Sequence, residues 1–186
     1  DAAADRPVQL GWQVTDPGME PVADAESLLV RLPDDVLPSP SAMLVHQILP
    51  VVHQREGISE AELANHLEQL IAPRTLVAGY NSRGFDDKFT QHIFYRCLRD
   101  PYAWQYADGR GRFDLYPVVL AYFVLAPEAI RWPEDHDGRP RFKLDRIGPL
   151  NQLDRGLKRA HDASSDVAVT ARLARKLALH DPDLFA

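Results

Sequence analysis

The sequence predicts an α/β fold, in which a sheet with antiparallel edge strands carries helices on its faces. β-prone segments lie early in the chain, at residues 7–15, 26–32 and 75–79, and helical patterns predominate later. Hydrophobic residues make up 45% of the 186 residues, which is enough for one core of ordinary domain size. We therefore expect residues 1–186 to form one domain.

The first two predicted strands form a hairpin. Residues 7–15 (PVQLGWQVT) are short and apolar, Asp16-Pro17-Gly18 stops them, and residues 26–32 (ESLLVRL) form the returning strand. Three prolines between residues 33 and 40 interrupt regular structure. A helical turn or loop is expected at residues 41–48.

Helices are predicted wherever apolar residues recur at helical spacing. The expected helices cover residues 59–71, 85–98, 117–126, 142–154 and 163–179. Ser59 and Glu62 give the first of them a capping box, in which each residue satisfies a backbone N–H group of the other. The last is expected to bury Val167, Leu173 and Leu177. Residues 127–141 form a Pro-rich surface loop.

The helix at residues 85–98 and the loop that follows it are rich in aromatic side chains. Phe85, Phe89, Ile93 and Cys97 are expected to share one side of that helix. The following loop contains Tyr102, Trp104 and Tyr106, which either stack on single-stranded bases or pack under the domain.

Composition excludes several classes of protein. No apolar run approaches the ~18 residues of a membrane span. The single cysteine, Cys97, excludes an internal disulfide and favours a reducing, cytoplasmic location. A net charge of −6 argues against a passive coat on nucleic acid. Residues 139–159 nevertheless hold seven cationic and two acidic residues, which form either a solvated face or a rim that contacts phosphate.

Three side chains are candidates for chemistry. Asp86 follows the apolar strand at residues 75–79, in the stretch GYNSRGFDDKFTQHIFY. His161 and Asp166 flank the start of the last helix, where Asp162 is the expected N-cap. Two carboxylates can hold hard divalent cations, and an imidazole with a pKa near ~6.5 can accept a proton from water. These residue types predict a hydrolytic metal site, most naturally for phosphodiesters.

Asn81-x-x-x-Phe85-Asp86, followed by His161-x-x-x-x-Asp166, resembles motifs two and three of the DEDDh 3′→5′ exonucleases. The longer stretches GYNSRGFDDKFTQHIFYRCLRDPYAW, IRWPEDHDGRPRFKL and AHDASSDV resemble bacterial exonuclease I, and the similarity runs over essentially the whole chain. The resemblance implies an RNase H-like fold and hydrolysis of single-stranded DNA from its 3′ end. It implies two Mg²⁺ ions as cofactors, for which Mn²⁺ can substitute.

The resemblance assigns roles to individual residues. Asp86 and Asp166 are implied as metal ligands and His161 as the general base. His46 lies in the segment that matches the family's loop near the 3′ nucleotide, or it is an ordinary exposed histidine. Phe85 contacts the terminal base or packs in the core. Asn81 contacts a neighbouring carboxylate or makes a local turn bond.

The family's first motif, Asp-x-Glu on the first strand, is absent at the expected place. In the relatives this pair lies a few residues before the stretch that matches residues 1–7, and the chain begins with Asp1 rather than Met. We therefore expect an N-terminally truncated domain that lacks its first strand and hydrolyses little or no DNA. Asp24-Ala25-Glu26 falls on an ordinary edge strand of the family, and we reject it as the motif.

The truncation also bears on partners. Downstream domains, and the contact that the family makes with single-strand binding protein, are expected to lie outside these residues, and the domain is expected to be a monomer.

Asp87, next to Asp86, is expected to face solvent.

Other functions remain as alternatives. An RNA-trimming or proofreading relative would belong to the same class of enzyme. A nucleic-acid-binding module that has lost catalysis would bind DNA without divalent metal, with an affinity that depends on salt. His161-Asp162 also matches the doublet of an HD-type phosphohydrolase, but that fold is all-helical and the predicted strands argue against it.

Overall fold

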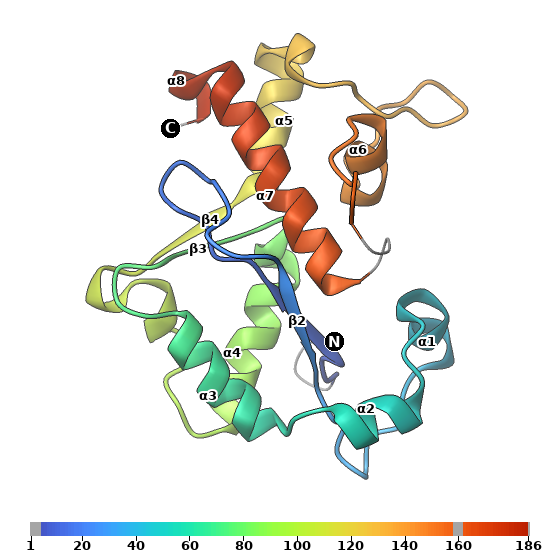
Figure 1. The fold of residues 1–186 in the computed structure, drawn as a ribbon, viewed down its shortest axis with the longest axis vertical. Coiled ribbons are helices and arrows are strands. Elements are labelled where there is room, and N and C mark those ends of the chain that lie inside the picture. The colour runs from blue at the N-terminus through green and yellow to red at the C-terminus, as the bar shows by residue number, and fades with distance from the viewer. Residues whose placement is uncertain (1–4, 158–161, 186) are drawn as a thin grey trace. The chain divides into compact units, whose positions relative to one another are not determined.

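The computed structural model describes residues 5–157 and 162–185. The chain divides into two compact units (Figure 1). The first runs to Leu10 and continues from Leu28 to Asp114, and the second comprises Gly11–Ser27 and the chain from Leu115 onward. The boundaries fall inside β1 (Gln9–Trp12) and β2 (Glu26–Leu29), so each unit is built from two separate stretches of sequence.

β1 and β2 form the predicted hairpin, with shorter strands than expected. The Val30 N–H group donates to the Val8 carbonyl and the Val22 N–H group to the Val14 carbonyl, both at 2.9 Å. These pairs show that the two stretches run in opposite directions. The turn between them is held by Asp16, whose carboxylate accepts the Glu20 N–H group at 2.9 Å.

The first unit contains the second sheet of the described chain and most of the early helices. Its elements are α1 (Pro40–His46), α2 (Pro50–Glu56), α3 (Glu60–Leu70), β3 (Leu76–Gly79), α4 (Asp86–Arg96) and β4 (Gly111–Asp114), with 3-10 turns at Ser82–Gly84 (η1), Ala103–Gln105 (η2) and Ala107–Gly109 (η3). β3 and β4 pair in parallel, with Leu76 opposite Gly111 and Gly79 opposite Asp114. The predictions did not include α2 or β4.

The core of the first unit lies between α3 and α4, which pack against each other (Figure 1). Leu63 and Leu67 of α3 meet Ile93 and Phe94 of α4 in this core. The predicted capping box is confirmed, because the Ser59 N–H group donates to the Glu62 carboxylate and the Glu62 N–H group to the Ser59 hydroxyl, at 2.7 and 3.2 Å.

The predicted buried side of α4 is wrong in part. Ile93 is buried and Phe89 and Cys97 are half-buried, but 61% of Phe85 is exposed. The reason is that Phe85 precedes the helix, with φ −134° and ψ −78°, and its side chain therefore does not follow the helical periodicity.

In the aromatic loop after α4, one side chain packs under the domain and two are exposed. Trp104 is buried, and its indole N–H group donates to the Pro101 carbonyl at 2.9 Å. Tyr102 and Tyr106 are exposed. Packing under the domain therefore applies to Trp104, whereas base stacking remains a prediction for the two tyrosines.

The second unit is helical apart from its part of the hairpin. Its helices are α5 (Leu115–Leu125), η4 (Pro127–Ala129), α6 (Leu144–Leu150), α7 (Ala163–His180) and α8 (Pro182–Phe185). α7 contacts α5, α6 and α8 (Figure 1). Leu173 and Leu177 of α7 are fully buried as predicted, whereas Val167 is half-buried. α6 is shorter than predicted, and Pro149 lies in its last turn.

Tyr122 of α5 joins two helices through a buried hydroxyl group. The Tyr122 hydroxyl donates to the carbonyl groups of Leu177 and Asp181, at 2.9 and 2.5 Å, at the C-terminal end of α7. Replacing it by phenylalanine is expected to lower the free energy of unfolding by about 1 kcal/mol, because buried carbonyl groups lose a donor. Thermal unfolding measures the loss. Tyr95→Phe, at an exposed tyrosine, is the control, and equal losses in both variants would contradict the prediction.

The predicted α/β class is confirmed. In the described residues the strands form two separate two-stranded sheets, and helices make up most of the remaining regular structure. Within residues 5–157 and 162–185, every helix is too short or too polar to span a bilayer.

Candidate active site

Asp86 stands at the junction that the sequence predicted, where a strand end leads into a helix. β3 ends at Gly79, Asn81 turns the chain with a left-handed backbone (φ 56°), and α4 begins at Asp86 after η1. Asn tolerates this conformation better than most residues. Asp86 is exposed in the first turn of α4, where the helix dipole favours a negative charge.

The surroundings of Asp86 make its carboxyl group hard to ionise. The pKa of Asp86 is raised to about 6, mainly because protein atoms crowd the carboxyl group and displace water. The carboxylates of Asp87 and Asp114 raise this pKa further, and the Arg112 guanidinium opposes them. Solvent still reaches Asp86, which is exposed at the start of α4. A cation beside Asp86 would be favoured by this concentration of negative charge.

β4 holds the turn that leads to Asp86. The Asp114 carboxylate accepts the N–H groups of Asn81 and Arg83, at 2.8 and 3.2 Å. Arg112 donates through Nη2 to the Ser82 hydroxyl at 2.8 Å and forms an ion pair with Asp87.

The expectation that Asp87 faces solvent is therefore wrong. Asp87 is only 8% exposed, because it pairs with Arg112. Arg112 and Asp114 were not predicted from the sequence as part of the site. The available signal was their spacing, since two charged residues at positions i and i+2 of a strand lie on the same face.

The three predicted substrate-binding residues differ in their surroundings. Phe85 is exposed, so the core-packing alternative is wrong and contact with a base remains a prediction. The centroid of its ring lies 4.8 Å from the centroid of the Phe89 ring. Asn81 does contact a carboxylate, that of Asp114, but through its backbone. His46 is half-buried, and its Nδ1 accepts the Ile48 N–H group at 3.0 Å.

A cationic pocket lies along the same turn of α4. It has a volume of about 550 Å³ and is lined by Arg83, Asp87, Lys88, Gln91, Gln105, Tyr106 and Arg112. Three of these side chains are cations and one is an anion, which suits a phosphate group. The basic segment at residues 139–159 is partly paired with the loop that precedes it, because Arg139 contacts Asp137 and Arg141 contacts Asp135. Whether the rest of it contacts phosphate remains a prediction.

Asp166 occupies the first turns of α7 in the second unit, where it is exposed. The predicted N-cap is confirmed, because the Asp162 carboxylate accepts the Ser164 N–H group at 3.0 Å. The Asp166 N–H group donates to the Asp162 carbonyl at 3.1 Å, which fixes the first turn of the helix. His161 lies outside the described residues, and its role as a base stays a prediction.

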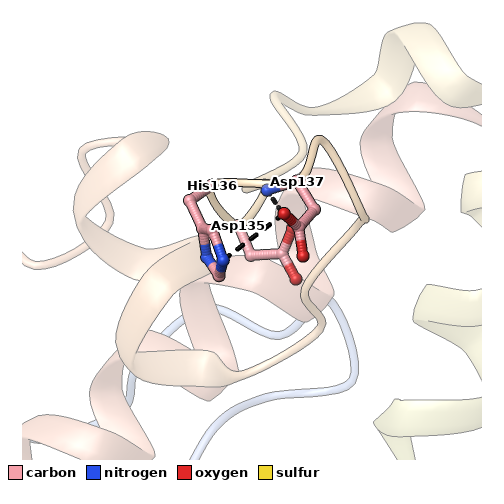
Figure 2. Close-up of side chains that lie close together, drawn as sticks. All are labelled: Asp135, His136 and Asp137. Carbon is pink, nitrogen blue, oxygen red and sulfur yellow. Dashed lines mark hydrogen bonds and ion pairs between the residues drawn. The ribbon is translucent and has the colours of Figure 1, made fainter.

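Another group of ligand-type side chains gathers in the surface loop (Figure 2). In the part of the chain that the structure describes, Asp135, His136 and Asp137 offer ligand atoms within 4.8 Å of one another. Hydrogen bonds within the turn account for this group, since Asp135 accepts the N–H groups of Asp137 and Arg139, both at 2.9 Å. The Arg139 N–H group is the main reason why the pKa of Asp135 is lowered. We assign this group a structural role in the turn.

Similarity to known proteins extends along the whole chain. The sequence is 38% identical to exodeoxyribonuclease I of Escherichia coli over 184 residues, and 35% identical to that of Haemophilus influenzae over 184 residues. Each match covers 98% of this chain and 38% of the relative. The chain therefore spans about two fifths of the length of these relatives.

Solved structures of exonuclease I have the same fold. The E. coli protein in complex with a dA16 oligonucleotide matches with a TM-score of 0.93 and 37% identity, over 99% of this chain and 39% of that one. Exonuclease I from Methylocaldum szegediense matches with a TM-score of 0.91 and 36% identity, over 100% and 39% of the two chains. The family model for exonucleases matches residues 1–174. The chain thus belongs to the exonuclease family and has the RNase H-like α/β fold of exonuclease I.

Proposed function

We propose that this chain is the exonuclease domain of an exodeoxyribonuclease that removes nucleoside monophosphates from the 3′ end of single-stranded DNA. The observation that carries the proposal is the exposed Asp86 carboxylate at the start of α4, in a chain that matches exonuclease I over 98% of its length. The complex of the E. coli relative with a dA16 oligonucleotide supports the choice of substrate.

Nucleases of this family generally use divalent metal ions, and the residues of this chain fit such ions. Asp86 presents a hard oxygen ligand to solvent, beside two further carboxylates that add negative charge. We propose that Asp86 and Asp166 hold the metal, with Mg²⁺ as the natural ion and Mn²⁺ as a substitute. When bound, two such ions supply Lewis-acid stabilisation of the attacking and leaving oxygens. A zinc-bound form of the E. coli exonuclease I–DNA complex has been solved.

The chain's own residues bind the strand and move the proton. His161 accepts a proton from the attacking water, which a neutral imidazole can do near pH 7. The exposed ring of Phe85 contacts the base of the terminal nucleotide. Asn81 and His46 contribute to the same binding site. Arg83 and Lys88 of the cationic pocket attract phosphate groups of the strand.

The 186 residues alone are proposed to hydrolyse DNA slowly or not at all. They contain one Asp-x-Glu sequence, Asp24-Ala25-Glu26, whose two carboxylates are exposed at the start of β2. Asp86 and Asp166 are then the remaining carboxylates for two cations of charge +2, which leaves the site short of negative ligands.

The proposed partners are single-stranded DNA and, for the longer relatives, single-strand binding protein. A structure of exonuclease I together with single-strand binding protein supports the second partner. We propose that these residues do not make that contact. The domain is proposed to be a monomer. It is proposed to lie in the cytoplasm because its single cysteine, Cys97, is free, as is usual in a reducing compartment.

The test adds an Asp-x-Glu motif in front of the chain. A completed domain is made by placing before Asp1 a strand that carries Asp-x-Glu, taken from the segment of the E. coli relative that precedes its match to this chain. With 5′-labelled oligothymidylate, the completed domain is expected to shorten the strand stepwise from the 3′ end when Mg²⁺ is present. The 186-residue chain is expected to leave the strand nearly intact.

The control is the same reaction with a chelator, which is expected to abolish shortening. Shortening from the 5′ end, or equal rates with and without metal, would overturn the proposal. Binding of DNA that ignores metal and weakens with salt, without any cleavage by the completed domain, would instead identify a binding module that has lost catalysis.

A further inference from the structure

Two charged residues of β4 reach the turn that carries Asp86. Arg112 and Asp114 are two positions apart on a strand, and both of their side chains contact the segment from Asn81 to Asp87. The parallel register with β3 sets Asp114 opposite Gly79, the last residue of β3 before that segment. We call this pair the β4 clamp.

The clamp holds a segment that has little packing of its own. Asn81, Arg83, Gly84 and Phe85 are exposed, so hydrophobic burial does not fix the path of this turn. Its N–H groups at positions 81 and 83 converge instead on one carboxylate, that of Asp114. Such charge-assisted bonds are about twice as strong as neutral ones.

Gly79 allows the turn to fold back closely on the strand end. A Cβ atom at this position would lie 2.7 Å from the Ser82 side chain, which is closer than side chains normally approach. Ser82 is buried there and accepts the hydrogen bond from Arg112. The turn is thus held at its Ser82 side chain by one clamp residue and at its backbone by the other.

We propose that the β4 clamp positions Asp86 for metal binding, with Asp114 as the main positioning residue. The inference rests on the proposed function, because it concerns the same metal site. A carboxylate ligand must be held within a fraction of an ångström of its productive position, and residues that orient ligands typically change metal affinity ~10- to 100-fold when they are replaced. The clamp also adds the buried negative charge of Asp114 near Asp86, which favours a cation there.

The decisive variant is Asp114→Asn in the completed domain. Asparagine keeps the size of the side chain, but it can offer one carbonyl oxygen where the carboxylate offers two, so one N–H group of the turn faces an amide N–H₂ group. The Kd for Mg²⁺, measured by calorimetry without DNA, is expected to rise at least ~10-fold, and the Mg²⁺ concentration for half-maximal hydrolysis is expected to rise with it. At saturating Mg²⁺ most of the rate is expected to return, and the KM for DNA is expected to change little.

A second variant and a matched control separate positioning from folding. Ser82→Ala removes the acceptor for Arg112 and is expected to shift the Mg²⁺ dependence in the same direction, by a smaller factor. Asp100→Asn alters a carboxylate that also accepts two N–H groups, those of Tyr102 and Ala103 at 2.8 and 3.0 Å. It is expected to leave the Mg²⁺ dependence unchanged. Thermal unfolding of each variant shows that the domain is folded at the assay temperature.

Different outcomes would overturn the inference about the β4 clamp and the proposed function. If the completed domain hydrolyses DNA and both Asp114→Asn and Ser82→Ala keep its Mg²⁺ dependence, the clamp has no part in metal binding and this inference fails alone. If Asp100→Asn shifts the Mg²⁺ dependence as much as Asp114→Asn, the effect is general and the inference also fails. If the completed domain shows no metal-dependent hydrolysis at all, the proposed function fails and the inference fails with it.

Discussion

Replacing Asp86 by asparagine is expected to reduce Mg²⁺-dependent hydrolysis by the completed domain by on the order of 10³-fold, because metal ions contribute several kcal/mol to stabilising the transition state. The variant keeps the shape of the side chain and the first turn of α4 but removes the negative oxygen ligand. Hydrolysis rates across a range of Mg²⁺ concentrations measure the effect. In contrast to Asp114→Asn, high Mg²⁺ is not expected to restore the rate.

The same variant is expected to be at least as stable as the original domain at pH 7. The folded-state pKa of Asp86 is raised to about 6, so between about pH 4 and that value the folded chain binds more protons than the unfolded chain. The carboxyl group therefore favours folding most at low pH, and this contribution is lost as pH rises through the folded pKa. Any gain in stability from Asp86→Asn should vanish below about pH 4.

The control for Asp86 is another exposed carboxylate in the first turn of a helix. Asp183 of α8 meets this description, and Asp183→Asn is expected to change neither the rate nor its dependence on Mg²⁺. Retention of more than about a tenth of the rate by Asp86→Asn, a loss of under ~1.4 kcal/mol, would show that Asp86 is not a metal ligand.

Asp87, the next residue, is expected to show the opposite behaviour. Its side chain and that of Arg112 are only 11% and 9% exposed, and they form an ion pair. Asp87→Asn leaves the buried guanidinium without its counter-charge, which typically costs about 3–5 kcal/mol. For a domain of this length the midpoint of thermal unfolding is then expected to fall by roughly 10 °C.

An exposed ion pair provides the comparison for Asp87. Arg55 and Glu56 contact each other with side chains that are 72% and 51% exposed. Glu56→Gln is expected to change the free energy of unfolding by less than about 0.5 kcal/mol, because water screens such pairs. If Asp87→Asn proved as mild as Glu56→Gln, the Asp87–Arg112 pair would not be a buried contact in solution.

Elements with strong local signals were predictable from the sequence. The capping box of Ser59 and Glu62 fixes the start of α3 by interactions within four residues, and Asp162 does the same for α7. β4 has no such signal, because its four residues, GRFD, include one large apolar side chain. It is a strand because β3 lies beside it, and that pairing joins positions about 35 residues apart.

The same distinction applies to the candidate site. Asp86 could be proposed as a candidate because its motif and its position after a strand are local properties of the sequence. Charged residues are mostly exposed, so Asp87 was assigned to the surface by default. Its burial follows from Arg112, which lies 25 positions later in the chain, and no local pattern joins the two residues. The prediction for His161 remains open, because that residue lies outside the described part of the chain.

The β4 clamp lies far along the sequence from the turn that it holds, and this separation affects the order of folding. The bond between the Asn81 N–H group and Asp114 closes a stretch of 33 residues. The entropy of closing such a stretch must be overcome before the bond forms, so α4 can become helical well before its first residue is held in place. During synthesis, residues 81–87 are made before β4, so Asp114 cannot hold them until β4 has also left the ribosome. A chain that ends before Gly111 should therefore contain Asp86 in a mobile turn, and Asp86 should be held in position only in a chain that includes Asp114.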